Sequence, residues 1–295
     1  MKKINEKLWH IILMLKRTQL GTRLVALIYA SGIVRLWNHL LYECDRNKPT
    51  LEMKRSRRFF KQNKMRVHRV ENLLEDEESK RVFRQCILYR ITHDWRVRPK
   101  YSRRDQYFPK DIISLNPEEV FIDCGAYNGD TIQSFLKYSH KKYKRIVAFE
   151  PDKNNIELIK NGGGLRRVSV IPAACWSSDT VLLFEENNGS SSRVKQSQDH
   201  DSNTIELTAK AIDHVEECSD ATFIKMDIEG SEYEALIGGY ETIARNRPKL
   251  AICIYHSDED MLRIAELIAS WNLGYKFYVR HHAQLVAETV LYAII

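Results

Sequence analysis

The chain has 295 residues, of which 43% are apolar and 29% charged, and its formal net charge is +7. This length holds one large or two modest domains, and the apolar fraction suffices for an ordinary packed core. The composition therefore predicts a soluble globular protein and excludes a low-complexity chain.

Positive charge is concentrated in the first part of the chain. Residues 1–110 hold 27 Lys and Arg against 11 Asp and Glu, a net charge of +16, which leaves a net charge of −9 for the remainder. Two functional zones are therefore expected. Nucleic acid, an anionic membrane and a phosphorylated substrate all respond to a basic region, so charge does not choose among them. The densest cluster is alternatively a solvated helix face; it comprises Lys54, Arg55, Arg57, Arg58, Lys61 and Lys64.

The N-terminal residues 1–45 predict amphipathic helices. No small-residue cleavage site follows the apolar run Leu8 to Leu15, so a secretory signal is not expected. The second run, Leu24 to Trp37, is shorter than the roughly 20 residues that cross a bilayer. Packing against the rest of the protein and peripheral attachment to a membrane are the two interpretations of these helices.

Six scattered cysteines form no C-x-x-C pair and no local Cys/His ligand spacing. This pattern predicts reduced thiols in the cytoplasm, most simply as small core residues, without a disulfide framework or a zinc site. No metal is expected.

Next along the chain, residues 46–70 predict a charged connector and residues 70–89 one amphipathic helix, with a boundary near 107–113. Strands and helices then alternate, which predicts a mainly parallel sheet covered on both faces. Two closing strands without a helix between them predict an antiparallel edge pair, and two strands around NNGSSSR an inserted hairpin. The expected strands are 120–124, 145–150, 168–173, 181–185, 204–209, 222–227, 249–255, 276–280 and 289–294; the expected helices are 130–138, 153–160, 231–246 and 258–271.

The stretch VFIDCGAYNGDT, residues 120–131, joins a buried strand to a helix through a glycine turn. Gly125 and Gly129 permit a tight turn and close approach of a ligand, and Asp123 lies at the strand end, where open α/β sheets bind ligands. Glu150 ends the next strand, where a carboxylate accepts hydrogen bonds from ribose hydroxyls. Its structural alternative is to cap the following helix.

This turn departs from G-x-G-x-x-G because Tyr127 occupies the place of the second glycine. A bulky side chain there disfavours NAD and FAD. Asp123 beside the turn would repel a diphosphate and attract a cation such as the sulfonium of S-adenosylmethionine. The turn therefore favours S-adenosylmethionine.

Three ionisable residues, Lys225, Asp227 and Glu229, alternate with apolar residues in FIKMDIEG. They would line one side of a central strand and its exit. Buried charges need partners, and this cost suggests a site. An ion pair of Lys225 with Glu229 or Asp123 is the structural alternative, and both interpretations can hold.

The strings FIDCGAYNGDT, AFEPD, FIKMDIEGSEYEALIGG, PKLAICIYH and YVRHH...ETVLYA, in this order, resemble the FkbM family of S-adenosylmethionine-dependent methyltransferases. The resemblance covers about two-thirds of the chain, from Phe108 to the C-terminus, and KMDIEG is its most specific part. It implies a Rossmann-like class I methyltransferase fold in residues 108–295, after a basic, mainly helical region in residues 1–107. It also implies O-methylation, often of sugars or secondary metabolites.

Position by position, the resemblance implies cofactor contacts for the first motif, a ribose contact for Glu150 and an adenine site near residues 174–179. Trp176 either stacks on the adenine or packs under the hairpin. The first-motif residues are Asp123, Gly125, Asn128, Gly129 and Asp130.

Methyl transfer to a hydroxyl needs an in-line approach and removal of the hydroxyl proton. The catalytic candidates are His256, Asp227 and Glu229. His256 is the first choice as base, because an imidazole near its usual pKa of about 6.5 suits neutral pH, and Asp227 is expected to orient cofactor or acceptor. His281 and His282 are further candidates or only mark a strand end. The loop Gly189 to Arg193 either contacts a sugar or phosphate or is solvated.

The sequence thus predicts a cytoplasmic O-methyltransferase that uses S-adenosylmethionine to methylate a hydroxyl of a sugar, a glycan precursor or a secondary metabolite. Peripheral attachment to the inner face of the membrane is the alternative location within the cytoplasm. The alternatives are a nucleic-acid-binding module or RNA methyltransferase that uses the basic region, a nicotinamide oxidoreductase, and an inactive scaffold. Nucleic acid is not the expected partner.

Overall fold

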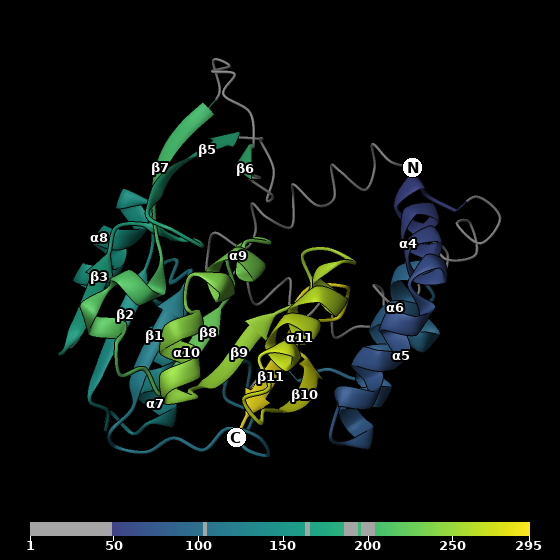
Figure 1. Ribbon diagram of the computed structural model, residues 1–295, viewed down its shortest axis with the longest axis horizontal. Coiled ribbons are helices and arrows are strands. Elements are labelled where there is room, and N and C mark those ends of the chain that lie inside the picture. Colours follow the sequence, from purple (N-terminus) through teal and green to yellow (C-terminus); the bar gives the residue numbers. More distant parts are fainter. Residues whose placement is uncertain (1–48, 103–104, 163–165, 186–193, 196–203) are drawn as a thin grey trace, which may run out of the picture. The chain divides into compact units, whose positions relative to one another are not determined.

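The computed structural model describes residues 49–102, 105–162, 166–185, 194–195 and 204–295 (Figure 1). These belong to two compact units. One contains the residues up to 58 and 87–98, and the other contains 59–86 and 99–295. The predicted helices in residues 1–45 and the loop 189–193 lie outside the described ranges. Within those ranges every helix is too short or too polar to cross a lipid bilayer.

The predicted connector 46–70 is wrong, because the chain there forms two helices, α4 (Leu51–Gln62) and α5 (Lys64–Leu73). Lys, Arg, Met and Leu are good helix formers, and in α4 Met53, Ser56 and Phe60 recur at helical spacing and are buried. The six basic residues of the densest cluster are exposed. This exposure is what both a solvated face and a binding surface require, so the role of the cluster stays a prediction.

The predicted helix 70–89 is also wrong as a single element. The helix α5 ends at Leu73, and α6 (Glu77–Thr92) starts after a turn. The Asp76 carboxylate accepts a hydrogen bond from the backbone N of Ser79 at 2.6 Å, which satisfies a donor of the first helical turn.

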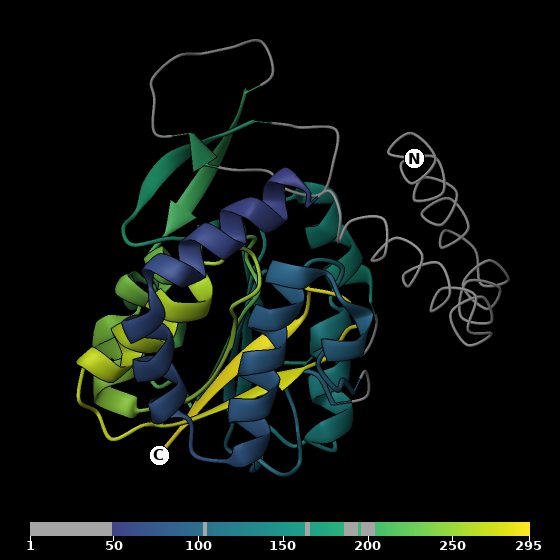
Figure 2. The same ribbon diagram turned by 90° about the vertical axis from the view of Figure 1, so that its right-hand side faces the viewer.

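The larger unit contains a seven-stranded sheet that confirms the predicted architecture (Figure 1). Five strands run parallel, and β11 pairs antiparallel with β9 and with β10, which lies at the edge (Figure 2). In spatial order the strands are β10 (Lys276–His281), β11 (Thr289–Ile294), β9 (Lys249–Cys253), β8 (Phe223–Met226), β1 (Val120–Cys124), β2 (Arg145–Phe149) and β3 (Val168–Ile171).

The inserted hairpin is confirmed as part of a second, four-stranded sheet. Its two long strands, β5 (Thr180–Glu185) and β7 (Thr204–Lys210), are antiparallel, and β4 (Ala174–Cys175) and β6 (Val194–Lys195) complete it. Along the chain, the strands alternate with the helices α7 (Asp130–Tyr138), α8 (Lys153–Asn161), α9 (Glu232–Ile237), α10 (Tyr240–Asn246) and α11 (Asp260–Ser270). The short helices η2 (Ile212–His214) and η3 (Glu216–Cys218) follow β7. The short helix η1 (Trp95–Val97) precedes the sheets.

The predicted helix 231–246 is instead the two helices α9 and α10, separated by Gly238 and Gly239. A Cβ atom on Gly238 would lie 2.1 Å from the backbone O of Trp176. The lack of a side chain at Gly238 therefore lets the segment after β4 approach the backbone more closely than another residue would allow.

An aromatic cluster joins the sheet to the segment that precedes it. Phe108 stands edge-on to Phe223 of β8 at 5.7 Å between ring centroids, and Phe121 of β1 stacks on Phe135 of α7 at 4.5 Å. All four rings are buried. Phe108 thereby holds its neighbour Tyr107 beside the ends of the central strands.

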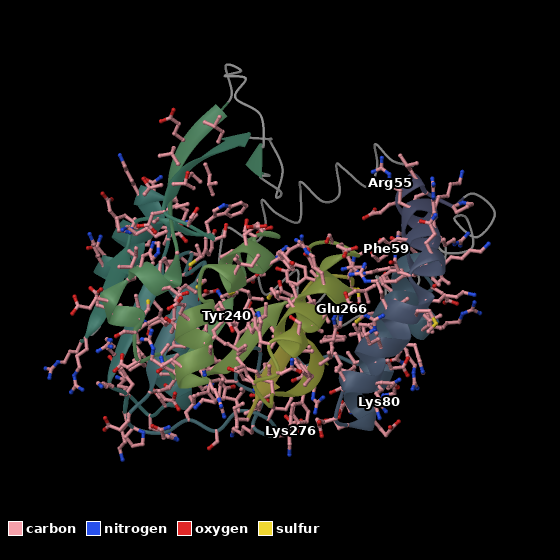
Figure 3. All side chains as sticks on the ribbon, viewed as in Figure 1. Arg55, Phe59, Lys80, Tyr240, Glu266 and Lys276 are labelled. Carbon is pink, nitrogen blue, oxygen red and sulfur yellow. The ribbon has the colours of Figure 1, made fainter. Side chains whose placement is uncertain are left out.

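Residues 59–86 are bound to the sheet unit by ion pairs. Arg66 of α5 contacts Glu259 at 2.6 Å and Glu266 of α11, labelled in Figure 3, at 2.7 Å. Arg280 of β10 contacts Asp76 at 2.7 Å. Part of the predicted N-terminal region thus packs in the unit that holds the sheet, and the functional boundary at 107/108 stays a prediction.

The Asp76–Arg280 pair should contribute to acid stability. Burial opposes ionisation, but hydrogen bonds from Arg280 and Ser79 hold the pKa of Asp76 at about 2, against a usual value of 3.8. A lowered folded-state pKa contributes stability above pH 3.8 that is lost as the pH falls towards 2. Because Asp76 is about one-third exposed, Asp76→Asn should lower the free energy of unfolding by about 1 kcal/mol at pH 7 and by less at pH 3. Urea unfolding at the two pH values measures this difference. Asp111→Asn, a more exposed partner of Arg280, is the control; an equal pH dependence in both variants would contradict the assignment.

Candidate active site

The carboxyl ends of the central strands β1, β8 and β9 meet at one edge of the sheet. Cys124 pairs with Met226, and Met226 pairs with Ile252. Asp227 follows β8 directly, and its backbone N donates to the carbonyl O of Cys124 at 3.1 Å. Three residues after β9 comes His256. The parallel register therefore brings together side chains from distant parts of the sequence.

The glycine turn after β1 lies at the same edge. Gly125 has a φ of 79°, and a Cβ atom there would lie 2.1 Å from the backbone O of Asp227. Gly129 has a φ of 85° and precedes α7. Asn128 and Asp130 are exposed, and the Asn128 side chain accepts a hydrogen bond from the Asp130 backbone N at 3.2 Å. The turn thus leaves exposed polar groups beside the start of α7.

Glu150, at the tip of β2, is buried and joins the glycine turn to the next helix. Its carboxylate accepts hydrogen bonds from the backbone N of Tyr127 at 2.8 Å and of Asp152 at 3.0 Å. Asp152 itself caps α8 by accepting from the backbone N of Asn155. Burial raises the pKa of Glu150, against the lowering effect of these hydrogen bonds. Glu150 therefore has a structural role in the turn, whether or not it also binds a ribose.

Asp123 and Lys225 form a buried ion pair, as the structural alternative predicted. They face each other on the paired strands β1 and β8, with 2.9 Å between Lys225 Nζ and Asp123 Oδ1. Their register neighbours Ala148 and Ala251 are small. Lys225 Nζ also donates to the carbonyl O of Gly125 at 2.8 Å. Asp123 is fully buried, so in this arrangement it supports the turn through Lys225.

Asp227 accepts hydrogen bonds from three side chains. Tyr107 donates to Oδ2 at 2.8 Å and Tyr255 donates to Oδ1 at 2.9 Å, while His256 Nε2 lies 3.2 Å from Oδ1. Burial favours the neutral acid, but the hydrogen bond from His256 and the charge of Lys225 hold the pKa of Asp227 well below its usual value. Asp227 is therefore a fixed negative charge at neutral pH.

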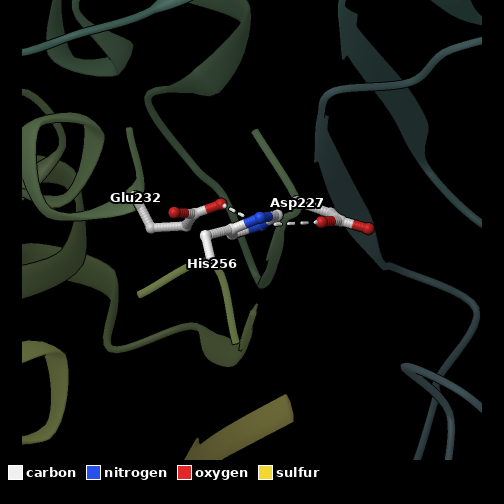
Figure 4. A group of neighbouring side chains, drawn as sticks. All are labelled: Asp227, Glu232 and His256. Atoms are coloured by element: carbon white, nitrogen blue, oxygen red, sulfur yellow. Dashed lines mark hydrogen bonds and ion pairs between the residues drawn. The ribbon is translucent and has the colours of Figure 1, made fainter. Parts of the chain in front are cut away.

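His256 lies between two carboxylates (Figure 4). Its Nε2 is 3.2 Å from Asp227 Oδ1 and 3.1 Å from Glu232 Oε1, and its Nδ1 is 3.6 Å from Glu229 Oε2. Burial disfavours the charged ring, but hydrogen bonds to Asp227 and Glu232 raise the pKa of His256 to about 10. In the ligand-free protein the ring thus holds a proton at pH 7, which it must lose before it can act as a base.

The other predicted residues are not part of this cluster. Both His281 and His282 are buried; His281 Nδ1 lies 2.9 Å from the hydroxyl of Thr289, and His282 contacts the carbonyl O of Ser102 and the hydroxyl of Tyr292. They mark the end of β10. Trp176 is half-buried and directly follows β4. The five described cysteines are buried and form no disulfide.

Three residues of the cluster are absent from the predicted set. Tyr255 and Glu232 stand within the motifs CIYH and EGSE, so their proximity to His256 and Asp227 could have marked them. Tyr107 is 120 positions from Asp227, and the packing of its neighbour Phe108 against the sheet helps to place it there. Glu232 is fully buried in the first turn of α9.

Comparison with known proteins places this geometry in a family. The family model described as the methyltransferase FkbM domain matches residues 123–277. The chain is 25% identical over 199 residues to the 2-O-methyltransferase NoeI of Sinorhizobium fredii, which covers 57% of this chain and 79% of that protein. Its fold is similar to the crystal structure of a methyltransferase FkbM from Methylobacillus flagellatus, with a TM-score of 0.67 and 24% identity.

That structural match covers 79% of this chain, and the chain spans 59% of the length of the solved protein. The match agrees with the predicted class I methyltransferase fold. Because the family model covers more than half of the 295 residues and includes the glycine turn, Glu150, Asp227 and His256, the chain belongs to the FkbM family of methyltransferases.

Proposed function

We propose that this methyltransferase moves a methyl group from S-adenosylmethionine to a hydroxyl of a sugar, a glycan precursor or a secondary metabolite. The observation that carries the proposal is the Asp227–His256 cluster at the carboxyl ends of β8 and β9, beside the glycine turn of β1. The similarity to a 2-O-methyltransferase supports a hydroxyl acceptor. S-adenosylmethionine supplies an electrophilic methyl group when bound.

The cofactor side is proposed to consist of the glycine turn and Glu150. Left-handed Gly125 and Gly129 form the tight turn, and Gly125 packs against the backbone O of Asp227 where a Cβ would collide. The fit to a cofactor is supported by the exposed polar side chains that this turn presents beside the start of α7. Asn128 and Asp130 offer exposed polar groups, and the Glu150 carboxylate would accept hydrogen bonds from the ribose hydroxyls. Asp123 would act through Lys225, and Trp176 would contact the adenine.

On the acceptor side, His256, Asp227 and Glu229 are proposed to handle the hydroxyl proton. Asp227 is held in place by two tyrosine hydroxyls, and it orients the ring of His256. Glu229 is 61% exposed on the Nδ1 side of that ring, which gives the proton a route towards solvent. Positioned proton transfer of this kind contributes about 10²- to 10⁴-fold to a rate.

The roles of the two regions also remain proposals. We assign the transfer reaction to residues 108–295, with Tyr107 contributing to the site. Residues 1–107 would form a basic, mainly helical region, and contact of the N-terminal helices with the inner face of a membrane stays a prediction.

Calorimetric titration of the full-length protein with S-adenosylhomocysteine tests the cofactor assignment. Wild type should bind at one site per chain, and Glu150→Gln should bind at least tenfold more weakly because a neutral amide is a poorer acceptor for ribose hydroxyls. Glu157→Gln, an exposed change on α8, is the control. Folded wild-type protein that binds NAD and not S-adenosylhomocysteine would overturn the proposal. If S-adenosylhomocysteine binds, the protein is next incubated with labelled S-adenosylmethionine and fractionated cell extract. Mass spectrometry of the labelled product would identify the acceptor.

A further inference from the structure

The cluster around His256 has the composition and spacing of a metal site. Asp227, Glu232 and His256 each place one potential ligand atom within 4.8 Å of the other two. They come from three elements: the end of β8, the first turn of α9 and the segment after β9. Figure 4 shows the His256 ring between the two carboxylates. Cysteine patterns could not reveal this site, because it contains no cysteine and its ligands are not a local Cys/His motif.

The distances suit a small divalent cation. A single ring nitrogen, His256 Nε2, faces Asp227 Oδ1 at 3.2 Å and Glu232 Oε1 at 3.1 Å. Adjacent ligands of an octahedral ion with bonds of about 2.1 Å are separated by about 3.0 Å. The Asp227 and Glu232 oxygens lie within 4.8 Å of each other. Side-chain movements that bring these two oxygens closer would therefore place all three atoms on one ion.

An independent observation at Glu232 also indicates a ligand. This side chain is fully buried, and its Oε1 already accepts a hydrogen bond from the backbone N of Ile228 at 2.8 Å. Its second oxygen, Oε2, is buried and has no hydrogen-bond partner among the described residues. A buried carboxylate oxygen without a partner is costly. Oε1 is the oxygen that faces His256, and a bidentate contact of the same carboxylate with an ion at the cluster would also give Oε2 a partner.

The surroundings orient the ligands and leave negative charge to be balanced. Tyr107 and Tyr255 donate to the Asp227 carboxylate, and Glu229 faces Nδ1 of His256, opposite the proposed ligand atom. Outer contacts of this kind are typical of metal ligands. The nearby cation Lys225 is already paired with Asp123.

We propose that Asp227, Glu232 and His256 bind one divalent cation of the Mg²⁺/Mn²⁺ class. Carboxylates suit both ions, and the imidazole favours Mn²⁺ over Mg²⁺. Resting on the proposed function, the ion would bind the acceptor hydroxyl in an open coordination position and ease loss of its proton. With the ion bound, His256 Nε2 is a ligand and not the base, so the proton would leave through Glu229, which is 61% exposed. The acceptor would then carry a hydroxyl at the position that reaches the ion.

Mn²⁺ binding to the full-length, chelator-treated and dialysed protein tests this site, with the free Mn²⁺ signal followed by electron paramagnetic resonance. Wild type should bind one Mn²⁺ per chain, Mg²⁺ should compete, and Glu232→Gln should weaken Mn²⁺ binding at least tenfold. Glu234→Gln on the same helix should bind like wild type. If Glu232→Gln fails to fold, His256→Gln takes its place with the same expectation.

Absence of saturable Mn²⁺ binding by wild type, or equal binding by the folded Glu232→Gln and Glu234→Gln variants, would overturn the proposal. S-adenosylhomocysteine binding by the same samples separates this outcome from failure of the proposed function. Metal-free wild type that binds S-adenosylhomocysteine but no Mn²⁺ would reject the metal site alone.

Discussion

Asp227→Asn should reduce the rate of methyl transfer about 10²- to 10⁴-fold, the range expected when positioned proton transfer is lost. The substitution keeps the size of the side chain but removes the negative charge that faces His256, and an amide nitrogen replaces one oxygen that accepts from a tyrosine hydroxyl. The measurement is the rate at which label moves from saturating S-adenosylmethionine to the cell-extract fraction that the wild-type protein methylates.

The matched control is Asp220→Asn. Asp220 forms a surface ion pair with Lys144 at 2.8 Å, next to the start of β2 and away from the strand ends that carry the cluster. The Asp220→Asn variant should stay folded, since exposed ion pairs contribute about 0–1 kcal/mol to stability. Because the cluster is unchanged, its transfer rate should stay within about twofold of wild type. A folded Asp227→Asn variant with more than a tenth of the wild-type rate would show that Asp227 is not part of the reaction.

Lys225→Met should destabilise the protein by about 3–5 kcal/mol at pH 7, because it leaves the Asp123 carboxylate buried without its cation. The pair is almost completely inaccessible, with side-chain exposures of 2% for Lys225 and 0% for Asp123. The double variant Asp123→Asn/Lys225→Met should be more stable than Lys225→Met, since no charge then remains buried. Urea unfolding of the two single variants and the double variant measures this coupling.

Acidification gives a second readout for Lys225→Met. Burial raises the pKa of Asp123 to about 6 even with Lys225 beside it, and loss of the lysine charge should raise it further. A raised folded-state pKa favours folding at low pH, and this contribution is lost as the pH rises through the folded-state value. Lys225→Met should therefore regain stability between pH 7 and pH 5. Lys210→Met, which removes an exposed partner of Asp179, should cost less than about 1 kcal/mol; similar losses in both lysine variants would contradict a buried charge.

Much of the fold could be predicted because its signals are local. Buried parallel strands appear in the sequence as short apolar runs. The predicted limits of β1, α7 and β11 agree with the structure. The errors lie where local signals compete. Charged residues in 46–70 suggested a connector, but buried Met53 and Phe60 at helical spacing decided for helices. The predicted helix 231–246 is divided at Gly238, where a neighbouring backbone passes closer than a side chain would allow.

The candidate site was predictable only in part for the same reason. Asp227 and His256 follow apolar strands, and parallel strands place such residues at one edge. Glu232 could have been marked by its place in EGSE, but its burial beside His256, 24 positions further along the chain, follows only from the fold. The proton held by His256 also differs from the expected neutral imidazole, since two carboxylates beside one ring raise its pKa.

By itself, the sequence determined the strands of the main sheet, the glycine turn after β1 and the family to which the chain belongs, because each depends on residues that are close together along the chain. Only the tertiary structure decided the partners: Lys225 for Asp123, Glu232 for His256 and Tyr107 for Asp227. These pairs depend on strand register and on the packing of distant segments, which set the burial and charge around each group and thereby its pKa.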